Sequence, residues 1–339
     1  MLSRASTIRH KPSGVDLQTP LLIPSFSSKG FARSKKDGRS EIGEILRYAA
    51  EFLTDSYLIS AYDVYYKDIP SPAELPTSLG LIFVDSGGYE TSTDKDYSSV
   101  IDPLPPPRDW DIEKLRTVLD SWPDELPAVF VNFDHYDERA PFLEQVKAAR
   151  RLFKKYPGHL HLFLIKPETK EQTTLNEVIK VVIANVGELT SFDIVGVTEK
   201  ELGPSMLDRM VRIAKLRRSM DEVDIQIPIH VFGALDPISV CLYFISGAEI
   251  FDGLTWIRYT FNEGQCVYTH NVGALKYGLH MRDSFVRTRS LSDNYYAIQL
   301  LEHRIREFEA TKIFDKLEPH GRLIRDAVDS LNTRLKGRD

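Results

Sequence analysis

The chain has 339 residues and a formal net charge of −6 at pH 7, with 42% hydrophobic and 27% charged residues. This composition is typical of a globular protein with a sizeable core, and the acidic balance excludes a uniformly basic nucleic-acid-binding protein. No apolar stretch approaches the roughly 18 residues that suggest a membrane-spanning helix, so no membrane partner is expected. Only two cysteines occur, Cys241 and Cys266, which excludes a disulfide scaffold and a structural zinc cluster and predicts a reducing, cytoplasmic compartment.

The N-terminal residues 1–16 are polar and basic and lack the apolar segment of a secretory signal. We therefore expect a flexible lead-in over residues 1–16. One barrel domain is predicted over residues 17–310, and a helical extension over residues 311–339.

Short apolar runs alternate with amphipathic segments almost from end to end, as in parallel α/β proteins. The runs predicted as buried strands are residues 21–23, 57–61, 81–84, 128–131, 161–165, 192–195, 229–232 and 249–251. Helical spacing of apolar residues predicts helices at 42–53, 142–153, 175–183 and 206–216, and two more follow at 292–309 and 320–335. Eight such strands favour an α/β fold, a closed (β/α)8 TIM barrel with additional C-terminal helices, over an open doubly wound sheet.

A proline-rich segment, residues 93–109, follows the third predicted strand and contains Pro103, Pro105, Pro106 and Pro107. These prolines predict an irregular loop. Such a loop either covers a substrate or is a surface excursion.

Two aspartates, Asp85 and Asp252, each follow the last apolar residue of a predicted strand. TIM barrels carry their chemistry at the C-terminal ends of their strands. Two carboxylates there allow one to act as a nucleophile while the other transfers protons. We therefore predict Asp85 and Asp252 as the catalytic pair.

The turn after Asp85 consists of Ser86, Gly87, Gly88 and Tyr89. Paired glycines let backbone N–H groups approach a ligand closely, because no Cβ obstructs them. A tight strand-to-helix turn in which Asp85 or Ser86 caps the helix explains the same residues.

Other strand ends carry candidate binding residues. Asp134 follows the fourth strand, and a carboxylate there accepts hydrogen bonds from the amine groups of a base. Gly196 ends the sixth strand and Phe232 with Gly233 ends the seventh, where glycine suits either a flat ligand or an ordinary turn.

The loop after Asp134 also offers possible metal ligands, His135, Asp137 and Glu138. We do not favour a metal site, because adjacent loop residues rarely point at one centre. No cofactor is expected, since the chain has no phosphate-binding P-loop, no dinucleotide fingerprint after the first strand and no Gly-x-Ser-x-Gly elbow.

Basic residues suggest a nucleic-acid backbone as a partner or simply a solvated charged face. Arg258 lies six residues beyond Asp252, where it either binds a phosphate or pairs with an acid. Two further basic groups comprise Lys29, Arg33, Lys35, Lys36 and Arg39, and Arg282, Arg287 and Arg289.

Taken in order, the motifs resemble those of the tRNA-guanine transglycosylases, TIM-barrel enzymes that exchange a guanine base for a 7-deazaguanine. The matching segments are Thr19-Pro20-Leu21-Leu22-Ile23-Pro24, Asp85-Ser86-Gly87-Gly88-Tyr89, Phe133-Asp134, Phe163-Leu164-Ile165, Phe192-Asp193-Ile194-Val195-Gly196-Val197, Phe232-Gly233, Gly247-Ala248-Glu249-Ile250-Phe251-Asp252, Gly264-Gln265 and Leu291-Ser292-Asp293-Asn294-Tyr295-Tyr296. The resemblance covers residues 17–310.

The resemblance implies that Asp252 attacks C1′ of a nucleotide and that Asp85 is the general acid and base. Covalent catalysis of this kind divides one difficult displacement into two steps. The implied substrate-binding residues are Ser86, Gly87, Tyr89, Asp134, Gly196, Phe232 and Gly233, with Tyr89 and Phe232 on the two faces of the base. The implied phosphate contact is Arg258, and Arg282, Arg287 and Arg289 are the further nucleic-acid-binding candidates.

The chain also departs from this family. The zinc site of three cysteines and a histidine is missing, and the family's glutamine after the fifth strand is replaced by Lys166 or Pro167. A second arginine after Arg258 is replaced within Phe261-Asn262-Glu263, and the family's glycine-rich loop is reduced to Val195-Gly196-Val197-Thr198-Glu199. A paralogue group that inserts 7-deazaguanines into DNA shares the barrel. We therefore favour DNA slightly over tRNA as the partner, with a preQ0-type base as the second substrate. A homodimer or proteins of a modification cluster are further candidate partners.

Two other functions stay open. A hydrolase would pass the covalent intermediate to water, which the change at Lys166 and Thr198 favours. A non-catalytic nucleic-acid-binding subunit would explain the missing zinc site and arginine, although both candidate catalytic aspartates are retained.

Overall fold

The fold is a closed barrel of eight parallel strands surrounded by helices, so the predicted (β/α)8 TIM barrel is confirmed and the open sheet is excluded. The computed structural model describes residues 1–34, 38–76, 80–92, 106–135, 138–169, 172 and 174–337. The barrel strands are β3 (Leu21–Phe26), β4 (Tyr57–Ser60), β5 (Ile82–Asp85), β6 (Ala128–Val131), β7 (Leu160–Leu164), β8 (Ile194–Thr198), β9 (Ile229–Phe232) and β10 (Ile250–Gly253). Strand β10 pairs with β3 and closes the ring.

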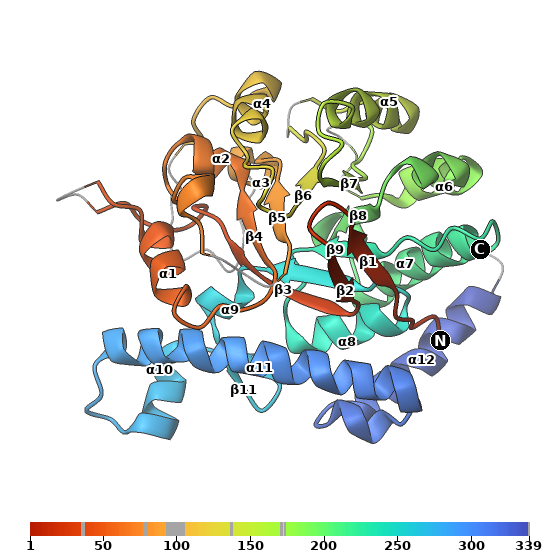
Figure 1. Cartoon of the computed structure of the whole chain (residues 1–339). Helices are drawn as coiled ribbons and strands as arrows, with labels where there is room; N and C mark the ends of the chain where they lie inside the picture. Colours follow the sequence, from red (N-terminus) through yellow and green to blue (C-terminus); the bar gives the residue numbers. More distant parts are fainter. Residues whose placement is uncertain are drawn as a thin grey trace.

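Helices cover the outside of the barrel (Figure 1). The α-helices of the described residues are α1 (Glu41–Ala49), α2 (Ala61–Tyr65), α3 (Gly88–Thr91), α4 (Ile112–Asp120), α5 (Phe142–Phe153), α6 (Asn176–Ala184), α7 (Met206–Asp221), α8 (Pro237–Ile245), α9 (Thr255–Arg258), α10 (Thr269–Val272), α11 (Asp283–Thr311) and α12 (Gly321–Lys336). Shorter turns of helix lie at Pro72–Glu74, Val186–Ser191, Glu199–Glu201, Gly273–Tyr277 and Phe314–Leu317. Among the described residues, no helix has the length and apolarity to cross a membrane.

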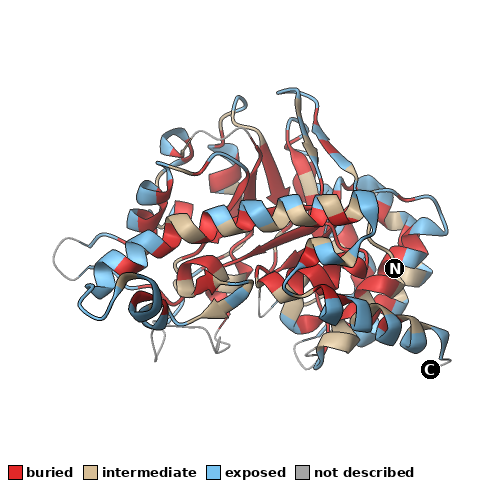
Figure 2. Ribbon diagram, turned by 90° about the horizontal axis from the view of Figure 1, so that it is seen from below, coloured by how far each residue is buried: buried red, intermediate tan, exposed pale blue. Residues whose placement is uncertain are grey.

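Alternating strand residues build two apolar layers, as the twofold periodicity of a strand requires. In β3, Leu21 and Ile23 face the barrel interior, whereas Leu22 belongs to the layer between strands and helices. Most residues of the barrel strands are accordingly buried in Figure 2, while the helices expose their outer faces. Strand β8 extends beyond its predicted end to Thr198, because Gly196 to Thr198 pair with β9.

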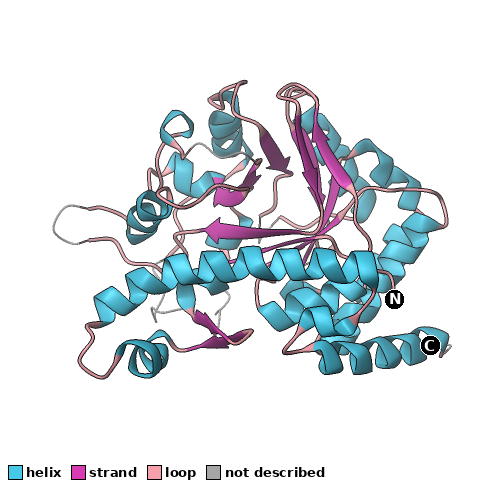
Figure 3. Cartoon of the chain, turned by 60° about the horizontal axis from the view of Figure 1, so that its bottom comes forward, coloured by secondary structure: helices cyan, strands magenta, loops and turns pink. Residues whose placement is uncertain are grey.

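The C-terminal half of the chain adds a long helix to the barrel. Helix α11 contacts β3, α8, α9 and the small antiparallel ribbon of β11 (Thr260–Asn262) and β12 (Gln265–Val267). It crosses beside the barrel strands in Figure 3. Glu302 on α11 accepts a hydrogen bond of 2.9 Å from the Leu22 backbone N–H, which attaches this helix to the seam of the barrel.

The first 18 residues differ from the expected flexible lead-in. They form an antiparallel hairpin of β1 (Thr7–His10) and β2 (Val15–Gln18). Ile8 packs into the interior cluster with the strand-start residues Leu21 and Leu160, so the hairpin covers the N-terminal end of the barrel. The polarity of the segment hid this structure, because only alternate residues of β1 are buried. The predicted loop at 93–109 lies outside the described residues except for 106–109.

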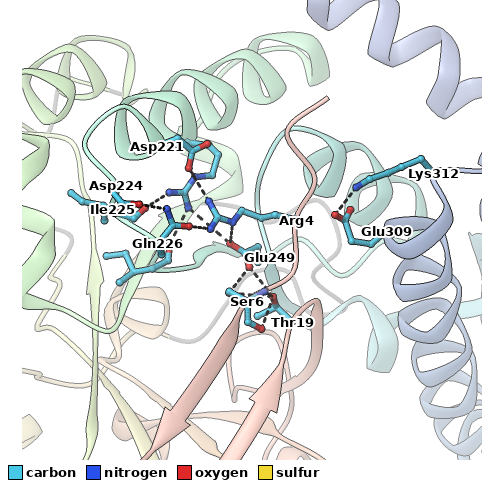
Figure 4. A network of polar contacts seen from close by, with 12 residues as sticks. Arg4, Ser6, Thr19, Asp221, Asp224, Ile225, Gln226, Glu249, Glu309 and Lys312 are labelled. Atoms are coloured by element: carbon cyan, nitrogen blue, oxygen red, sulfur yellow. Dashed lines mark hydrogen bonds and ion pairs between the residues drawn. The ribbon is translucent and has the colours of Figure 1, made fainter.

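Buried charges attach the hairpin to the barrel (Figure 4). The Glu249 carboxylate is fully buried and accepts hydrogen bonds from the Ser6 hydroxyl at 2.5 Å and the Thr19 hydroxyl at 2.7 Å. Arg4 lies 3.5 Å and the fully buried Arg217 3.9 Å from the same carboxylate. Burying such groups costs stability unless each charge has its partner.

Replacing Glu249 by alanine should therefore lower the free energy of unfolding by about 3 kcal/mol, because Arg217 keeps its charge in the core without this acid. The control is Glu177→Ala, which removes an exposed ion pair with Lys180 on α6 and should change stability little. Urea unfolding of both variants measures the difference. Equal stability of the two variants would show that the buried cluster is not needed to hold the hairpin.

Candidate active site

A cavity of about 590 Å³ opens at the C-terminal ends of the barrel strands. Every barrel strand contributes to its wall through a residue within three positions of its C-terminal end. These wall residues include Ser25, Ser60, Asp85, Asp134, Leu164, Thr198, Phe232 and Asp252. The cavity thus occupies the end of the barrel at which TIM-barrel enzymes carry their active sites.

The Asp252 carboxylate is buried in the cavity wall and receives hydrogen bonds at both oxygens. Ser25 donates its hydroxyl to Oδ2 at 2.7 Å. The Oδ1 atom lies 2.9 Å from His230 Nε2 and accepts a bond of 3.3 Å from the Gly233 N–H. Three donors on one carboxylate hold it in a single orientation, as a nucleophile requires.

The second predicted catalytic residue, Asp85, lies in the same cavity wall. Burial raises the pKa of its carboxyl well above the ordinary value, and the negative charges of Glu90 and Asp252 raise it further. A carboxyl with a raised pKa beside a carboxylate suits a general acid next to a nucleophile. The structure therefore brings the two predicted aspartates together in different electrostatic environments.

Sequence reasoning missed two acids near Asp85, of which Glu90 also lines the cavity. Glu90 on α3 accepts hydrogen bonds from the hydroxyls of Ser27 and Ser60, the latter at 2.8 Å. Asp63 on α2 is fully buried and accepts a bond of 2.7 Å from the Ser28 N–H. Burial raises the pKa of Asp63 well above its usual range, and the charge of Glu90 adds to this rise. Their only sequence signal is an acid placed three to five residues beyond a strand end.

Asp134 lies in the cavity wall as predicted, but its carboxylate already has cationic partners. Arg139 donates to Oδ1 at 2.7 Å, and Lys166 Nζ lies 3.4 Å from Oδ2. Lys166 also lies 2.8 Å from Glu201 and donates to Thr198 at 3.2 Å. Burial alone would lower the pKa of Lys166, but the charges of Asp134 and Glu201 outweigh it and raise the pKa above the ordinary value.

Lys166, which the sequence comparison placed at the family's glutamine, therefore contributes a charged donor to the cavity. It lies directly beside the acceptor Asp134. This wall thus presents a donor and an acceptor side by side to a ligand.

The glycine-rich turn is divided between the cavity and the core. Gly88 and Tyr89 line the cavity, whereas Ser86 and Gly87 do not belong to its wall. Gly87 has φ +91°, and a Cβ there would lie 2.7 Å from the Trp110 ring nitrogen, so this glycine is required by packing. Gly87 is the N-cap of α3 and no side chain caps the helix, which excludes capping by Asp85 or Ser86.

Of the predicted base-binding residues, Tyr89, Phe232 and Gly233 line the cavity and Gly196 does not. A Cβ on Gly196 would approach the Phe232 ring to 2.8 Å, so this glycine makes room for that ring. Phe232 stacks on His230 with ring centroids 4.0 Å apart. The Tyr89 ring is covered by Lys29 Nζ, which lies 4.4 Å from its centroid.

The predicted nucleic-acid-binding arginines separate into two groups. Arg258 lines the cavity and donates to the Lys29 carbonyl at 2.9 Å and towards the Tyr89 hydroxyl at 3.4 Å. The other three, on or at the start of α11, are exposed and lie outside the cavity wall; they are Arg282, Arg287 and Arg289. Arg287 pairs with Glu41 at 2.7 Å and Arg289 with Asp293 at 3.0 Å.

The basic stretch near residue 30 is only partly described, because Lys35 and Lys36 lie outside the described residues. Arg33 forms an ion pair with Asp68, and Arg39 lies 3.8 Å from Glu44. The pairing of Arg33 and Arg39 with acids agrees with a charged face as well as with a phosphate site.

Within the described ranges, no group of three or more histidine, cysteine, aspartate and glutamate side chains could hold a metal ion. Asp137 of the alternative metal site lies outside them, and His135 and Glu138 pair as an isolated β-bridge. Cys266 donates its thiol to Asp236 at 3.0 Å.

A scan against protein-family models finds no matching family, and a search of the curated proteins finds no matching sequence.

Because these acids are buried, we expect the stability of the folded protein to depend on pH. A carboxyl whose pKa is raised on folding binds more protons in the folded state, so stability falls as pH rises from the unfolded value of about 3.9 towards the raised folded value. Asp63→Asn should remove part of this fall and stabilise the protein at pH 8, by about 1.4 kcal/mol for each unit by which the Asp63 pKa is raised.

The matched control is Asp326→Asn on the exposed surface of α12, which should keep the pH dependence of the original protein. Denaturant unfolding between pH 4 and pH 8 measures all three proteins. Parallel curves for Asp63→Asn and the original protein would contradict the assignment of Asp63 as a buried acid with a raised pKa.

Proposed function

We propose that this protein exchanges guanine in a polynucleotide for a 7-deazaguanine base through a covalent bond between Asp252 and C1′ of the nucleotide. The observation that carries the proposal is the pairing in one cavity of a donor-held carboxylate, Asp252, with an acid of raised pKa, Asp85. The resemblance of the strand-end motifs to tRNA-guanine transglycosylases supports this reaction over other uses of two carboxylates.

In the first step, an Asp252 oxygen attacks C1′, the bond from C1′ to N9 of guanine breaks, and the electron pair of that bond leaves with the base. Asp85 gives its proton to the leaving base. In the second step, the incoming base loses its N9 proton to Asp85 and attacks C1′, and the Asp252 carboxylate is released. Asp85 thereby regains the proton that it lost, and the overall exchange is balanced.

The cavity also offers the groups that a purine requires. Tyr89 and Phe232 supply aromatic faces for stacking, and Asp134 is an acceptor for the N1–H and 2-amino groups of guanine. The Lys166 ammonium beside it is a donor for the 6-oxo group. Adenine would place an amine against Lys166, so this pair favours a 6-oxo-2-amino purine.

A nucleotide within a chain reaches such a cavity only when it is turned out of its stack. Arg258 and Lys29 supply positive charge at the cavity for the flanking phosphates. We favour DNA slightly over tRNA, because Cys266 lacks the three partners of the zinc site found in the tRNA enzymes and instead contacts Asp236. Hydrolysis of the intermediate is the second candidate reaction, favoured by the replacement of a base-selecting glutamine by Lys166.

Asp252→Asn should abolish incorporation of labelled guanine into DNA or tRNA, because the amide is a poor nucleophile. Asp85→Asn should lower the rate at least about 100-fold, since proton transfer contributes that much in many enzymes. Asp16→Asn, at the opposite end of the barrel, is the matched control and should retain full activity.

Three outcomes separate the candidate functions. Release of guanine without any requirement for an incoming base would identify a hydrolase. Incorporation that persists in Asp252→Asn within a reconstituted complex would identify a non-catalytic subunit. No exchange with either nucleic acid would contradict the proposal.

The variant Lys166→Gln tests whether Lys166 contacts the incoming base. Glutamine keeps an N–H donor but carries no charge, so the charge-assisted bond to the 6-oxo group is lost and Asp134 and Glu201 are left with Arg139 as their cation; the KM for the incoming base should rise about tenfold. The control, Lys180→Gln, removes an exposed lysine on α6 and should leave the KM unchanged. An unchanged KM in Lys166→Gln would show that Lys166 does not contact the base.

A further inference from the structure

His230 contacts the proposed nucleophile, and neither the motifs nor the resemblance singled it out. It comes from β9, its side chain is fully buried, and its Nε2 lies 2.9 Å from Asp252 Oδ1. Its ring stacks on Phe232 at 4.0 Å with an interplanar angle of 20°, and its edge meets Phe83 at 5.7 Å. Two aromatic rings and one hydrogen bond therefore fix the imidazole beside the proposed nucleophile.

The contacts of the imidazole ring indicate which of its two nitrogens carries the proton. The Nδ1 atom is buried and has no hydrogen-bond partner among the described residues, whereas Nε2 faces a carboxylate oxygen. A carboxylate accepts hydrogen bonds, so the proton of the neutral ring belongs on Nε2. His230 is thus a donor to Asp252, with its unprotonated nitrogen turned into the apolar barrel interior.

The two oxygens of Asp252 are not equivalent. Oδ1 has two donors, His230 Nε2 and the Gly233 N–H, while Oδ2 has the Ser25 hydroxyl. Ser25 belongs to the cavity wall and His230 does not. Oδ2 has fewer donors and therefore keeps more electron density. It also lies towards Ser25, the donor that lines the cavity.

We propose that Oδ2 of Asp252 attacks C1′ and that His230 is a positioning residue, which holds Oδ1 and stabilises the carboxylate when the covalent bond breaks. This inference rests on the proposed base exchange. In the covalent intermediate, Oδ1 is the ester carbonyl oxygen. When the incoming base attacks C1′, the C1′–Oδ2 bond breaks, its electron pair returns to the carboxylate, and the charge that develops on Oδ1 meets two donors already in place.

The donors therefore act unequally on the two steps. In the first step the donors hold the carboxylate in position but also withdraw electron density from it. Their loss therefore has opposing effects on the rate of this step. In the second step they stabilise only the developing charge, so their loss slows the release of the intermediate. A purely structural role for His230 would slow both steps together.

The test compares His230→Phe, which keeps an aromatic ring and removes the donor, with His230→Gln, which restores an N–H donor. Single-turnover reactions of the full chain with guanine-containing DNA and tRNA measure formation of the covalent adduct and its decay after guanine is added. We expect the adduct of His230→Phe to decay about 100-fold more slowly and to accumulate, which is the lower end of the effect that loss of one preorganised donor has in other enzymes. His230→Gln should decay within a few-fold of the original protein.

Thermal unfolding of both variants checks that each is folded, and ¹⁵N NMR of the imidazole gives a readout without turnover. The resonances lost in His230→Gln should be those of a ring protonated at Nε2 and bare at Nδ1. Three results would overturn the inference. They are equal decay rates of the adducts of His230→Phe and the original protein, equal reductions of the decay rate in His230→Phe and His230→Gln, and a proton on Nδ1. If the original protein forms no adduct with either nucleic acid, base exchange itself fails, while the NMR result still decides whether His230 donates to Asp252.

Discussion

The pairing of β10 with β3, which closes the barrel, is the constraint on which the site depends. Asp252 lies opposite Ile23 in this pairing, and Ser25, two residues further along β3, donates to its carboxylate. On the other side of β10, β9 supplies His230 and leads into Gly233. The three donors of Asp252 thus come from both neighbours of one strand. An open sheet would leave β10 without one of these neighbours and the carboxylate without part of its support.

A second constraint is the crowding of acids at the same end of the barrel. Asp85, Glu90, Asp63 and Asp252 lie close enough for their charges to act on one another, and burial raises the pKa of Asp63 and Asp85. Another part of the cavity wall balances its own acids, Asp134 and Glu201, with Arg139 and Lys166. One part of the wall thus carries acids of raised pKa, while the other presents paired charges. This division matches a reaction in which a base leaves and a base returns.

Much of the fold was predictable from the sequence, because buried parallel strands are short, apolar and bounded by polar turns. The eight predicted runs correspond to the eight barrel strands, and the two strand-end aspartates share one cavity. The hairpin of residues 7–18 was missed because its exposed positions are polar. His230 was missed because a histidine inside a predicted strand is typical of a buried core residue. Its contact with Asp252 follows only from the pairing of β9 with β10. Ser86, Gly87 and Gly196 were predicted to bind substrate, but the structure places them outside the cavity wall.

Mapping the adduct decides whether Asp252 forms the proposed covalent bond to the nucleotide. The full chain is incubated with guanine-containing DNA or tRNA, quenched in denaturant, digested and analysed by mass spectrometry. We expect a sugar-phosphate mass on the peptide that contains Asp252, at Asp252 itself. An adduct on Asp85, or exchange of guanine with Asp252 unmodified at every time point, would contradict it.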